Sequence, residues 1–218
     1  MRTNTIRRVT ATAGAAIAAL LGLLTIASGT ASAAPGDARL LKDRVVRSFA
    51  TNNLLVPQNG NVNAPILDTP RIGKANATPE SQTWIEVTPG KAERDALAKQ
   101  GFTFGSAVAL RFQPSADNRP LCIDVQNDSL NPGAALVLRP CDGTPTQLWE
   151  RLGANANPFL RNVRTRLNIE VQNGRAVQQP FVGRIPSGIS LQERQALQQR
   201  NNSQQFFLSP KSFGVGGA

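Results

Sequence analysis

The stretch that decides the fold is Leu121–Trp149, LCIDVQNDSLNPGAALVLRPCDGTPTQLW. Two short apolar runs, LCIDV and AALVL, flank a segment rich in turn residues, which is typical of two strands joined by a loop. Cys122 and Cys141 lie in or beside these runs and are the only cysteines of the chain. The stretch ends in Gln-Leu-Trp, where Gln147 and Trp149 share one face of a strand. We therefore expect Trp149 to fill a core and Gln147 to bond nearby backbone.

Residues 1–33 are predicted to be a secretory signal peptide. They begin with scattered arginines, continue as a small-apolar run over residues 13–26 and end in Ala-Ser-Ala. This is the pattern of a cleaved leader, too short and wrongly flanked for a membrane anchor. We expect cleavage between Ala33 and Ala34 and hence a secreted protein. No later apolar run approaches the length of a membrane span, so we expect no transmembrane segment.

In an oxidising compartment the two cysteines are expected to pair as a Cys122–Cys141 disulfide. The alternative, a metal pair, is disfavoured because the chain has no histidine and the cysteine spacing is not C-x-x-C. A disulfide closing a loop of this size stabilises the fold by roughly 3 kcal/mol in the chain-entropy account.

The absence of histidine narrows the function most. It excludes Ser-His-Asp and Cys-His nucleophile systems and any histidine-held metal. Carboxylate-pair chemistry needs no histidine, but the acids of this sequence are scattered and no pair is marked out for it. We therefore expect neither an enzyme nor a cofactor or metal site.

The chain is basic, with 24 Lys and Arg against 14 Asp and Glu, a net charge of +10. Removing the three arginines of residues 1–33 leaves +7 (21 minus 14). Such a surplus favours anionic partners such as acidic glycans, teichoic acid or phospholipid headgroups. Nucleic acid is not expected, because the basic residues are dispersed and not clustered with aromatic residues. A soluble basic protein without any such partner would have the same composition.

Short apolar segments bounded by turn residues recur along the chain and predict many short strands. We expect residues 34–44 to be a loose lead-in, residues 45–209 to be one domain and residues 210–218 to be a tail. One helix is predicted within residues 88–101, with Thr88 as its N-cap and Gly101 at its end. A second is predicted from Leu191 to Gln199, because Ser190 and Glu193 have capping-box spacing.

A Gln-x-aromatic motif occurs three times and indicates an internal repeat. The pairs are Gln82 with Trp84, Gln147 with Trp149, and Gln204 with Phe206. The aromatic residues are 65 (149 minus 84) and 57 (206 minus 149) positions apart. The segment LNIEV, residues 167–171, also matches LCIDV, residues 121–125. Three repeats of short strands predict an all-β fold, a β-trefoil of three pseudo-repeats with two short inserted helices.

The middle repeat resembles the ricin-type (ricin B-like) β-trefoil lectin family. The likeness spans Val45 to Phe207 but is strong only in the middle unit. The residues that carry it are Cys122-Ile123-Asp124-Val125, Gly133, Leu138, Cys141 and Gln147-Leu148-Trp149. The resemblance implies a trefoil of three subdomains with shallow pockets for galactose-type sugars and no catalysis.

By this resemblance Asp124 is the carboxylate that accepts sugar hydroxyls, and Gln147 supports it. Two positions depart from the family. Arg139 stands where an aromatic residue is expected to cover the sugar, and a guanidinium there would suit an anionic sugar. Thr146 stands where an asparagine is expected. The alternative reading of Asp124 is that it caps a turn and bonds backbone amides.

The outer repeats fit the family less well. Glu170 occupies the carboxylate place in the third unit, and Phe181 lies near the aromatic position. Both cysteines are missing there, with Asn168 and Val182 near their places. The first unit has Val56 or Pro57 where the acid should be, so no sugar site is expected in it.

The first functional hypothesis is a secreted, non-enzymatic, carbohydrate-binding protein with one or two weak sugar pockets. The alternative is a non-catalytic cell-binding or assembly subunit of a multi-component secreted toxin, similar to the flanking subunits of cytolethal distending toxins, with a secreted enzymatic subunit as partner. A further alternative is a secreted protease inhibitor on a trefoil scaffold, for which residues 68–81 would supply the exposed loop.

Overall fold

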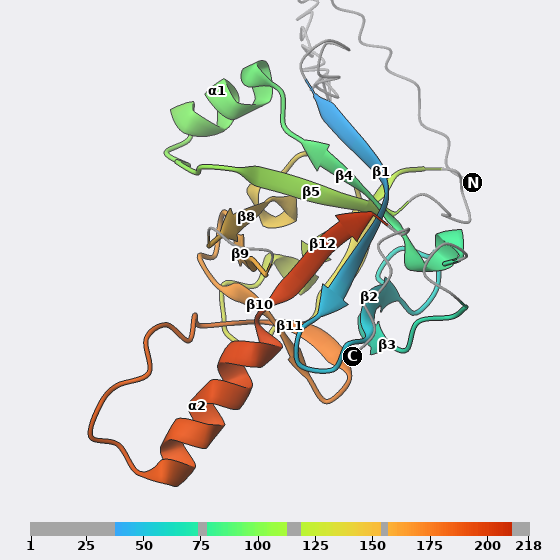
Figure 1. The fold of residues 1–218 in the computed structure, drawn as a ribbon. Coiled ribbons are helices and arrows are strands. Elements are labelled where there is room, and N and C mark those ends of the chain that lie inside the picture. The colour runs from blue at the N-terminus through green and yellow to red at the C-terminus, as the bar shows by residue number, and fades with distance from the viewer. Residues whose placement is uncertain (1–37, 74–77, 113–118, 154–156, 211–218) are drawn as a thin grey trace, which may run out of the picture. The chain divides into compact units, whose positions relative to one another are not determined.

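The computed structural model describes residues 38–73, 78–112, 119–153 and 157–210, and the predicted signal peptide lies outside them. The described residues contain twelve strands, which are connected by helices, turns and loops (Figure 1). They are β1 (Arg39–Ser48), β2 (Leu54–Pro57), β3 (Ile66–Thr69), β4 (Trp84–Thr88), β5 (Ala107–Phe112), β6 (Leu121–Val125), β7 (Leu136–Pro140), β8 (Trp149–Leu152), β9 (Phe159–Asn162), β10 (Asn168–Gln172), β11 (Arg175–Gln179) and β12 (Phe206–Pro210). The helices are α1 (Lys91–Lys99) and α2 (Leu191–Ser203), with short 3-10 turns η2 (Glu80–Gln82), η3 (Gln126–Asp128) and η4 (Pro145–Gln147).

Half of the strands form a closed antiparallel ring. Strand β1 pairs with β4, β4 with β5, β5 with β8, β8 with β9, and β12 with β1. The remaining gap, between β9 and β12, is bridged by the antiparallel pair Phe159 and Gln205. Closure removes the free edges of these strands, which is how small all-β domains avoid edge-to-edge association.

The other strands form the hairpins β2–β3, β6–β7 and β10–β11. Antiparallel bridges join the hairpins in a cycle: Pro65 to Val137, Ala135 to Val177, and Arg175 to Leu67. In each hairpin the two bridging residues lie two positions apart, and the last bridge returns to the first hairpin. This cyclic register gives the three-fold pseudosymmetry of a β-trefoil and fixes which residues of the three units are equivalent. The predicted fold class is confirmed.

The core is filled by triplets of equivalent apolar residues, each at most 1% exposed. They are Trp84, Trp149 and Phe206; Val46, Leu110 and Leu160; Leu55, Ile123 and Ile169; and Ile66, Leu136 and Ala176. Alternation along each strand sends every second side chain inward, so each unit supplies the same layers. The aromatic residue of each Gln-x-aromatic motif is therefore a core residue.

The first strand begins at Arg39 and not at the expected Val45. Residues 38–44 of the predicted lead-in are thus part of the described structure, whereas residues 34–37 lie outside it. Strand β1 extends because Arg39 and Leu40 pair with β4 ahead of an irregularity in the register. At the other end β12 reaches Pro210, and residues 211–218 lie outside the described residues.

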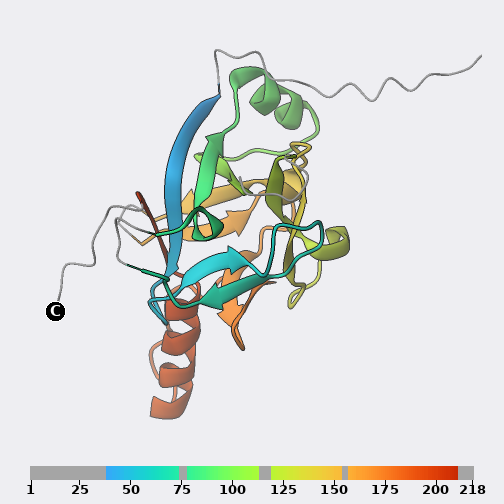
Figure 2. The same cartoon turned by 90° about the vertical axis from the view of Figure 1, so that its right-hand side faces the viewer.

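Both predicted helices are present, with corrected ends. Helix α1 has Gly90 and not Thr88 as its N-cap, because Thr88 is the last residue of β4. Its other end is as expected, with Gly101 at φ +86° and its N–H bonded to the carbonyl of Ala98. Helix α2 has the predicted capping box of Ser190 and Glu193 but continues to Ser203. The two helices lie at opposite ends of the strand assembly (Figures 1 and 2).

Candidate functional site

The glutamine of each repeat makes two hydrogen bonds to the backbone segment that follows the hairpin, and we call this pair of bonds the glutamine clamp. Its side-chain Nε2 donates to a proline carbonyl, and its Oε1 accepts from the N–H two residues further on. The donor bonds run from Gln82 to Pro70 (2.9 Å), Gln147 to Pro140 (2.8 Å) and Gln204 to Pro180 (2.8 Å). The acceptor bonds come from Ile72 (2.8 Å), Asp142 (3.0 Å) and Val182 (3.0 Å). Because the first unit makes this clamp without an acid, the glutamine has a structural role in every unit.

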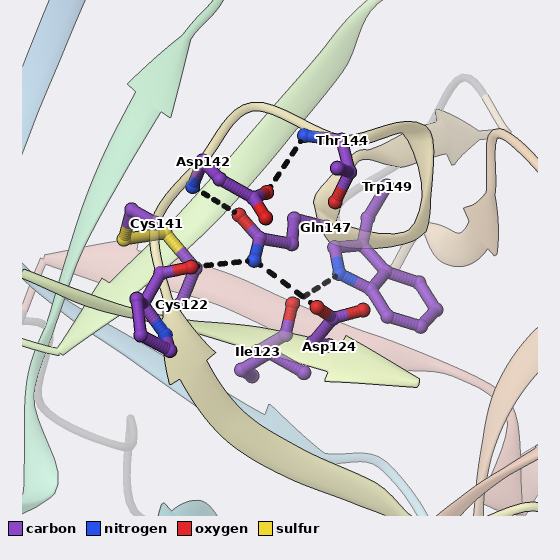
Figure 3. The surroundings of a disulfide bond; sticks show 9 residues. Cys122, Ile123, Asp124, Cys141, Asp142, Thr144, Gln147 and Trp149 are labelled. Atoms are coloured by element: carbon purple, nitrogen blue, oxygen red, sulfur yellow. Dashed lines mark hydrogen bonds between the residues drawn. A yellow bond between two sulfur atoms is a disulfide. The ribbon is translucent and has the colours of Figure 1, made fainter. Parts of the chain in front are cut away.

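In the middle unit this clamp stands beside the disulfide (Figure 3). Cys122 and Cys141 are bonded at an S–S distance of 2.03 Å, which confirms the predicted pair. Cys122 lies in β6, and Cys141 directly follows β7. The disulfide thus ties the first hairpin strand to the segment whose next residue, Asp142, donates its N–H to Gln147.

Asp124 lies beneath this clamp and is 4% exposed. Its Oδ1 accepts the N–H of Val125 at 2.7 Å and its Oδ2 accepts Nε2 of Gln147 at 3.1 Å. Burial raises the pKa of Asp124, and hydrogen bonds from Gln147, Thr146 and Val125 oppose that shift. The structure thus brings Asp124 and Gln147 together, as the resemblance implied.

A second carboxylate, Asp128, lies near Asp124. Repulsion from Asp128 adds to the rise in the pKa of Asp124. Thr146 is fully buried, and its Oγ1 lies 3.2 Å from Oγ1 of Thr144 and 3.5 Å from Oδ1 of Asp128. A hydroxyl that rotates between these partners is able to donate or accept.

Arg139 lies on the same face of the hairpin as Asp124. The register pairs Asp124 with Val137 and Cys122 with Arg139, and residues opposite one another project to the same side. The guanidinium Nη1 donates to Oδ1 of Asn63 at 3.2 Å. Asn63 lies between β2 and β3 of the first unit, so a neighbouring unit contributes to the rim of the middle unit. The sequence carried no signal for this contact, because it joins residues 76 positions apart.

In the third unit Glu170, the equivalent of Asp124, is 2% exposed and is surrounded by donors. Oε1 accepts from Gln172 (2.8 Å) and from Nε of Arg200 (3.3 Å). Oε2 accepts from Nη2 of Arg200 (3.1 Å) and from Gln204 (2.6 Å). Sequence reasoning missed Arg200. The sequence did offer one signal for this contact, because Arg200 lies at the end of the predicted helix and four residues before Gln204.

The register also places the remaining positions of the outer units. Val56 is the first-unit equivalent of Asp124, since Val56 pairs with Leu67 as Asp124 does with Val137. The third-unit residue at the place of Arg139 is Gln179, whereas Phe181 stands at the place of Cys141. Phe181 packs edge-on against Phe159, with ring centroids 4.9 Å apart.

Over the described ranges, no cluster of Cys, Asp and Glu is arranged to hold a metal ion. In that same part of the chain, no helix is long and apolar enough to span a membrane.

Comparison with known proteins identifies the fold. No family model and no curated protein matches the sequence. Among solved structures, the designed three-fold symmetric protein ThreeFoil aligns with a TM-score of 0.52 and 17% identity, over 76% of this chain and 96% of its own. An exo-β-1,3-galactanase from Clostridium thermocellum gives 0.50 and 16%, over 77% of this chain and 30% of its own. A mosquitocidal holotoxin gives 0.50 and 11%, over 78% and 17%.

At these identities the likeness is one of fold. The chain covers nearly all of the designed trefoil but less than a third of the galactanase and of the holotoxin. Unrelated functions share a fold, so what this chain does has to be argued from its own residues.

Proposed function

We propose that this chain is a secreted, non-catalytic, carbohydrate-binding protein of the ricin-type trefoil kind, with one sugar site over Asp124. The observation that carries the proposal is the difference between the three equivalent positions. Val56 has no polar group to offer a sugar. Glu170 accepts four protein hydrogen bonds, and a carboxylate has about four lone-pair sites.

Asp124 retains acceptor capacity. Its hydrogen bonds from Val125 and Gln147 engage one lone pair on each oxygen. The hydroxyl of Thr146, which also supports Asp124, rotates and is able to exchange that bond for one to a ligand. Sugar hydroxyls donate well to an ionised carboxylate, because such charge-assisted bonds are short and strong. Gln147 acts here as a positioning residue, since its donors are already taken by Asp124 and Pro140.

The local charge favours a neutral sugar. Asp128 repels negative charge at Asp124, and Arg139 is directed to Asn63. An acidic sugar over Asp124 would meet carboxylates, whereas a galactose-type sugar would meet acceptors for its hydroxyls. We therefore assign neutral saccharides to this site.

Secretion forms part of the proposal. It is supported by the leader pattern of residues 1–33 and by the Cys122–Cys141 disulfide, a bond typical of exported proteins. The toxin-subunit hypothesis remains a second hypothesis, to be tested by co-purification with a secreted enzyme. Of the loop considered for protease inhibition, residues 74–77 lie outside the described residues.

The test is a glycan screen followed by titration with matched amide variants. We expect the full chain to bind neutral galactose-type saccharides and Asp124→Asn to lose at least about tenfold in affinity, the contribution of one charge-assisted hydrogen bond. Glu170→Gln removes the equivalent carboxylate of the third unit and should leave affinity unchanged. Thermal unfolding of both variants verifies that they are folded. Equal affinity of wild type and folded Asp124→Asn would overturn the proposal.

A further inference from the structure

A turn of the third unit presents arginines around a single buried carboxylate. Arg161 donates two hydrogen bonds to Glu150 of the neighbouring strand, from Nε and Nη2 to Oε2 at 3.0 and 2.7 Å. Arg166 places Nη1 at 2.9 Å from the same oxygen. Arg164 lies between them in the chain and is exposed. We call Arg161, Arg164 and Arg166 the arginine turn.

Glu150 is ionised and pairs with Arg161 and Arg166. It is 4% exposed, and its Oε1 also accepts the N–H of Gly105 at 3.0 Å. Burial alone would raise the pKa of Glu150, but Arg161, Gly105 and Arg166 outweigh it and lower the pKa. One negative charge is thus paired with two positive ones, and Arg164 adds a third positive charge to the turn. Arg161 already pairs with Glu150 through two nitrogens and neutralises its charge. Arg164 and Arg166 therefore give the turn a net positive charge.

The first unit contains the same turn without the added arginines. Ser48 and Asn162 begin the two turns, and each accepts the N–H four residues on, from Asn52 and Arg166, at 3.1 Å. Their own N–H groups bond five residues on, to Asn53 (2.9 Å) and Leu167 (2.8 Å). The fourth residue after each start is left-handed, with φ of 61° in both.

This match shows what the turn requires of its residues. Asn52 has the side chain that a left-handed position favours, whereas Arg166 occupies the same conformation at a steric cost. Ala50 stands where the third unit has Arg164. The backbone therefore forms without either arginine, and a residue kept in an unfavourable conformation points to a role beyond the turn itself.

The arginines retain donors for a ligand. The Arg166 side chain is 46% exposed and the Arg161 side chain 27% exposed. Arg166 approaches Glu150 through Nη1, and a guanidinium has a planar set of N–H donors that matches carboxylate and sulfate oxygens. Because Glu150 already orders Arg161 and Arg166, little side-chain entropy is left to lose on binding.

We propose that the arginine turn is an anion-binding surface for an acidic glycan, that is, a saccharide carrying carboxylate or sulfate groups. A membrane fits less well, because anionic lipid surfaces are typically bound by clusters of about four to eight basic residues. The arginine turn shares no residue with the neutral-sugar site over Asp124. Only the choice of a glycan as the source of the anion rests on the proposed function.

The experiment compares two double variants of the full chain that lose the same charge. R164A/R166N gives these two positions the residues of the first-unit turn, Ala50 and Asn52, so the variant should fold and should unfold at the same temperature or higher. R184A/R194A removes two exposed arginines elsewhere. The probes are heparin oligosaccharides, polygalacturonate, a neutral galactan, and vesicles of phosphatidylserine with phosphatidylcholine.

We expect wild type to bind the acidic saccharides, and R164A/R166N to bind at least about tenfold more weakly. R184A/R194A should stay within about twofold, because it leaves every arginine of the turn in place. Asp124→Asn should leave heparin affinity intact, which separates this surface from the neutral-sugar site. Equal losses in both double variants, or no heparin binding by wild type, would overturn the proposal. Vesicle binding without glycan binding would overturn the assignment to a glycan.

Discussion

Three equivalent residues, Val56, Asp124 and Glu170, show how one position takes different roles in a pseudosymmetric protein. All are buried to a similar degree, so exposure does not distinguish them. What differs is the set of donors around the side chain. Arg200 from α2 engages both oxygens of Glu170, whereas over the described ranges no arginine pairs with Asp124. A binding role at this position therefore depends on neighbours and not on the acid alone.

The raised pKa of Asp124 predicts how sugar affinity depends on pH. The ionised carboxylate accepts sugar hydroxyls, so binding is complete above its pKa and declines as pH falls through that pKa. Because burial raises the pKa, the decline should begin above the ordinary value of ~3.9. Protonation favours the native state, so the stability linked to Asp124 is fully present below ~3.9 and is lost as pH rises through the raised pKa. Calorimetric titrations with sugar between acid and neutral pH measure how the affinity depends on pH. Sugar affinity that stays constant as the pH is lowered to about 3.9 would contradict this prediction.

Asn168 predicts a stabilising substitution. The residue is fully buried, and neither Nδ2 nor Oδ1 has a hydrogen-bond partner within the described structure. The first-unit equivalent is Leu54, which is also fully buried. Asn168→Leu should raise the free energy of unfolding by roughly 1–3 kcal/mol, the cost of a buried unpaired polar group. Urea denaturation measures this, and the reverse exchange, Leu54→Asn, should cost stability. A loss of stability in Asn168→Leu would refute the assignment.

The disulfide and the glutamine clamp of the middle unit hold the same segment, the one that follows β7. Cys141 and Asp142 are neighbours, and the first is bonded to Cys122 while the second donates to Gln147. The outer units have the clamp without a disulfide. The disulfide therefore adds to a connection that the fold already makes.

Removing the disulfide should weaken the fold without abolishing it. We expect Cys122→Ser with Cys141→Ser to lower the free energy of unfolding by about 2–4 kcal/mol. Chemical denaturation measures the loss. An unfolded double variant would mean that the clamp of Gln147 cannot hold the segment alone.

Helix α2 depends on its ends, because none of its residues is buried. Such a polar helix gains little from packing and is stabilised by caps and local pairs. Ser190→Ala should remove the capping box and destabilise the helix by about 1 kcal/mol. Hydrogen exchange should show faster exchange in α2, with Glu193→Gln as a milder variant, and unchanged protection in β10. Unaltered exchange in α2 would contradict this account of its stability.

The elements were largely predictable from the sequence, because strand alternation, turn residues and the capping box are local patterns. The ends were less so. Thr88 and Pro89 satisfy the rules for a helix start, but β4 takes Thr88 into the sheet. Likewise β1 extends to Arg39 because β4 offers a partner, which no local pattern could indicate. Arg200 and Asn63 were missed for the same reason, since their contacts depend on tertiary structure.

At the scale of the whole molecule, the repeat in the sequence was enough to predict the trefoil. Three Gln-x-aromatic pairs recur because each unit needs a clamp and a core aromatic. The symmetry covers the core and the clamps, whereas the surface differs between units. The middle unit carries Asp124, the third carries the arginine turn and the first carries Asn63 at the rim of the middle unit. This division supports one neutral-sugar site and one acidic-glycan surface in a single domain.

The most direct test of the proposed function is the stoichiometry of neutral-sugar binding by isothermal titration calorimetry. A galactose-type ligand should bind the full chain at one site, because only Asp124 among the three equivalent positions has acceptors free for a sugar. Glu170→Gln should leave this stoichiometry unchanged, and Asp124→Asn should weaken binding at the site by at least about tenfold. Two or three equal sites per chain, or a single site of unchanged affinity in folded Asp124→Asn, would contradict the proposed function.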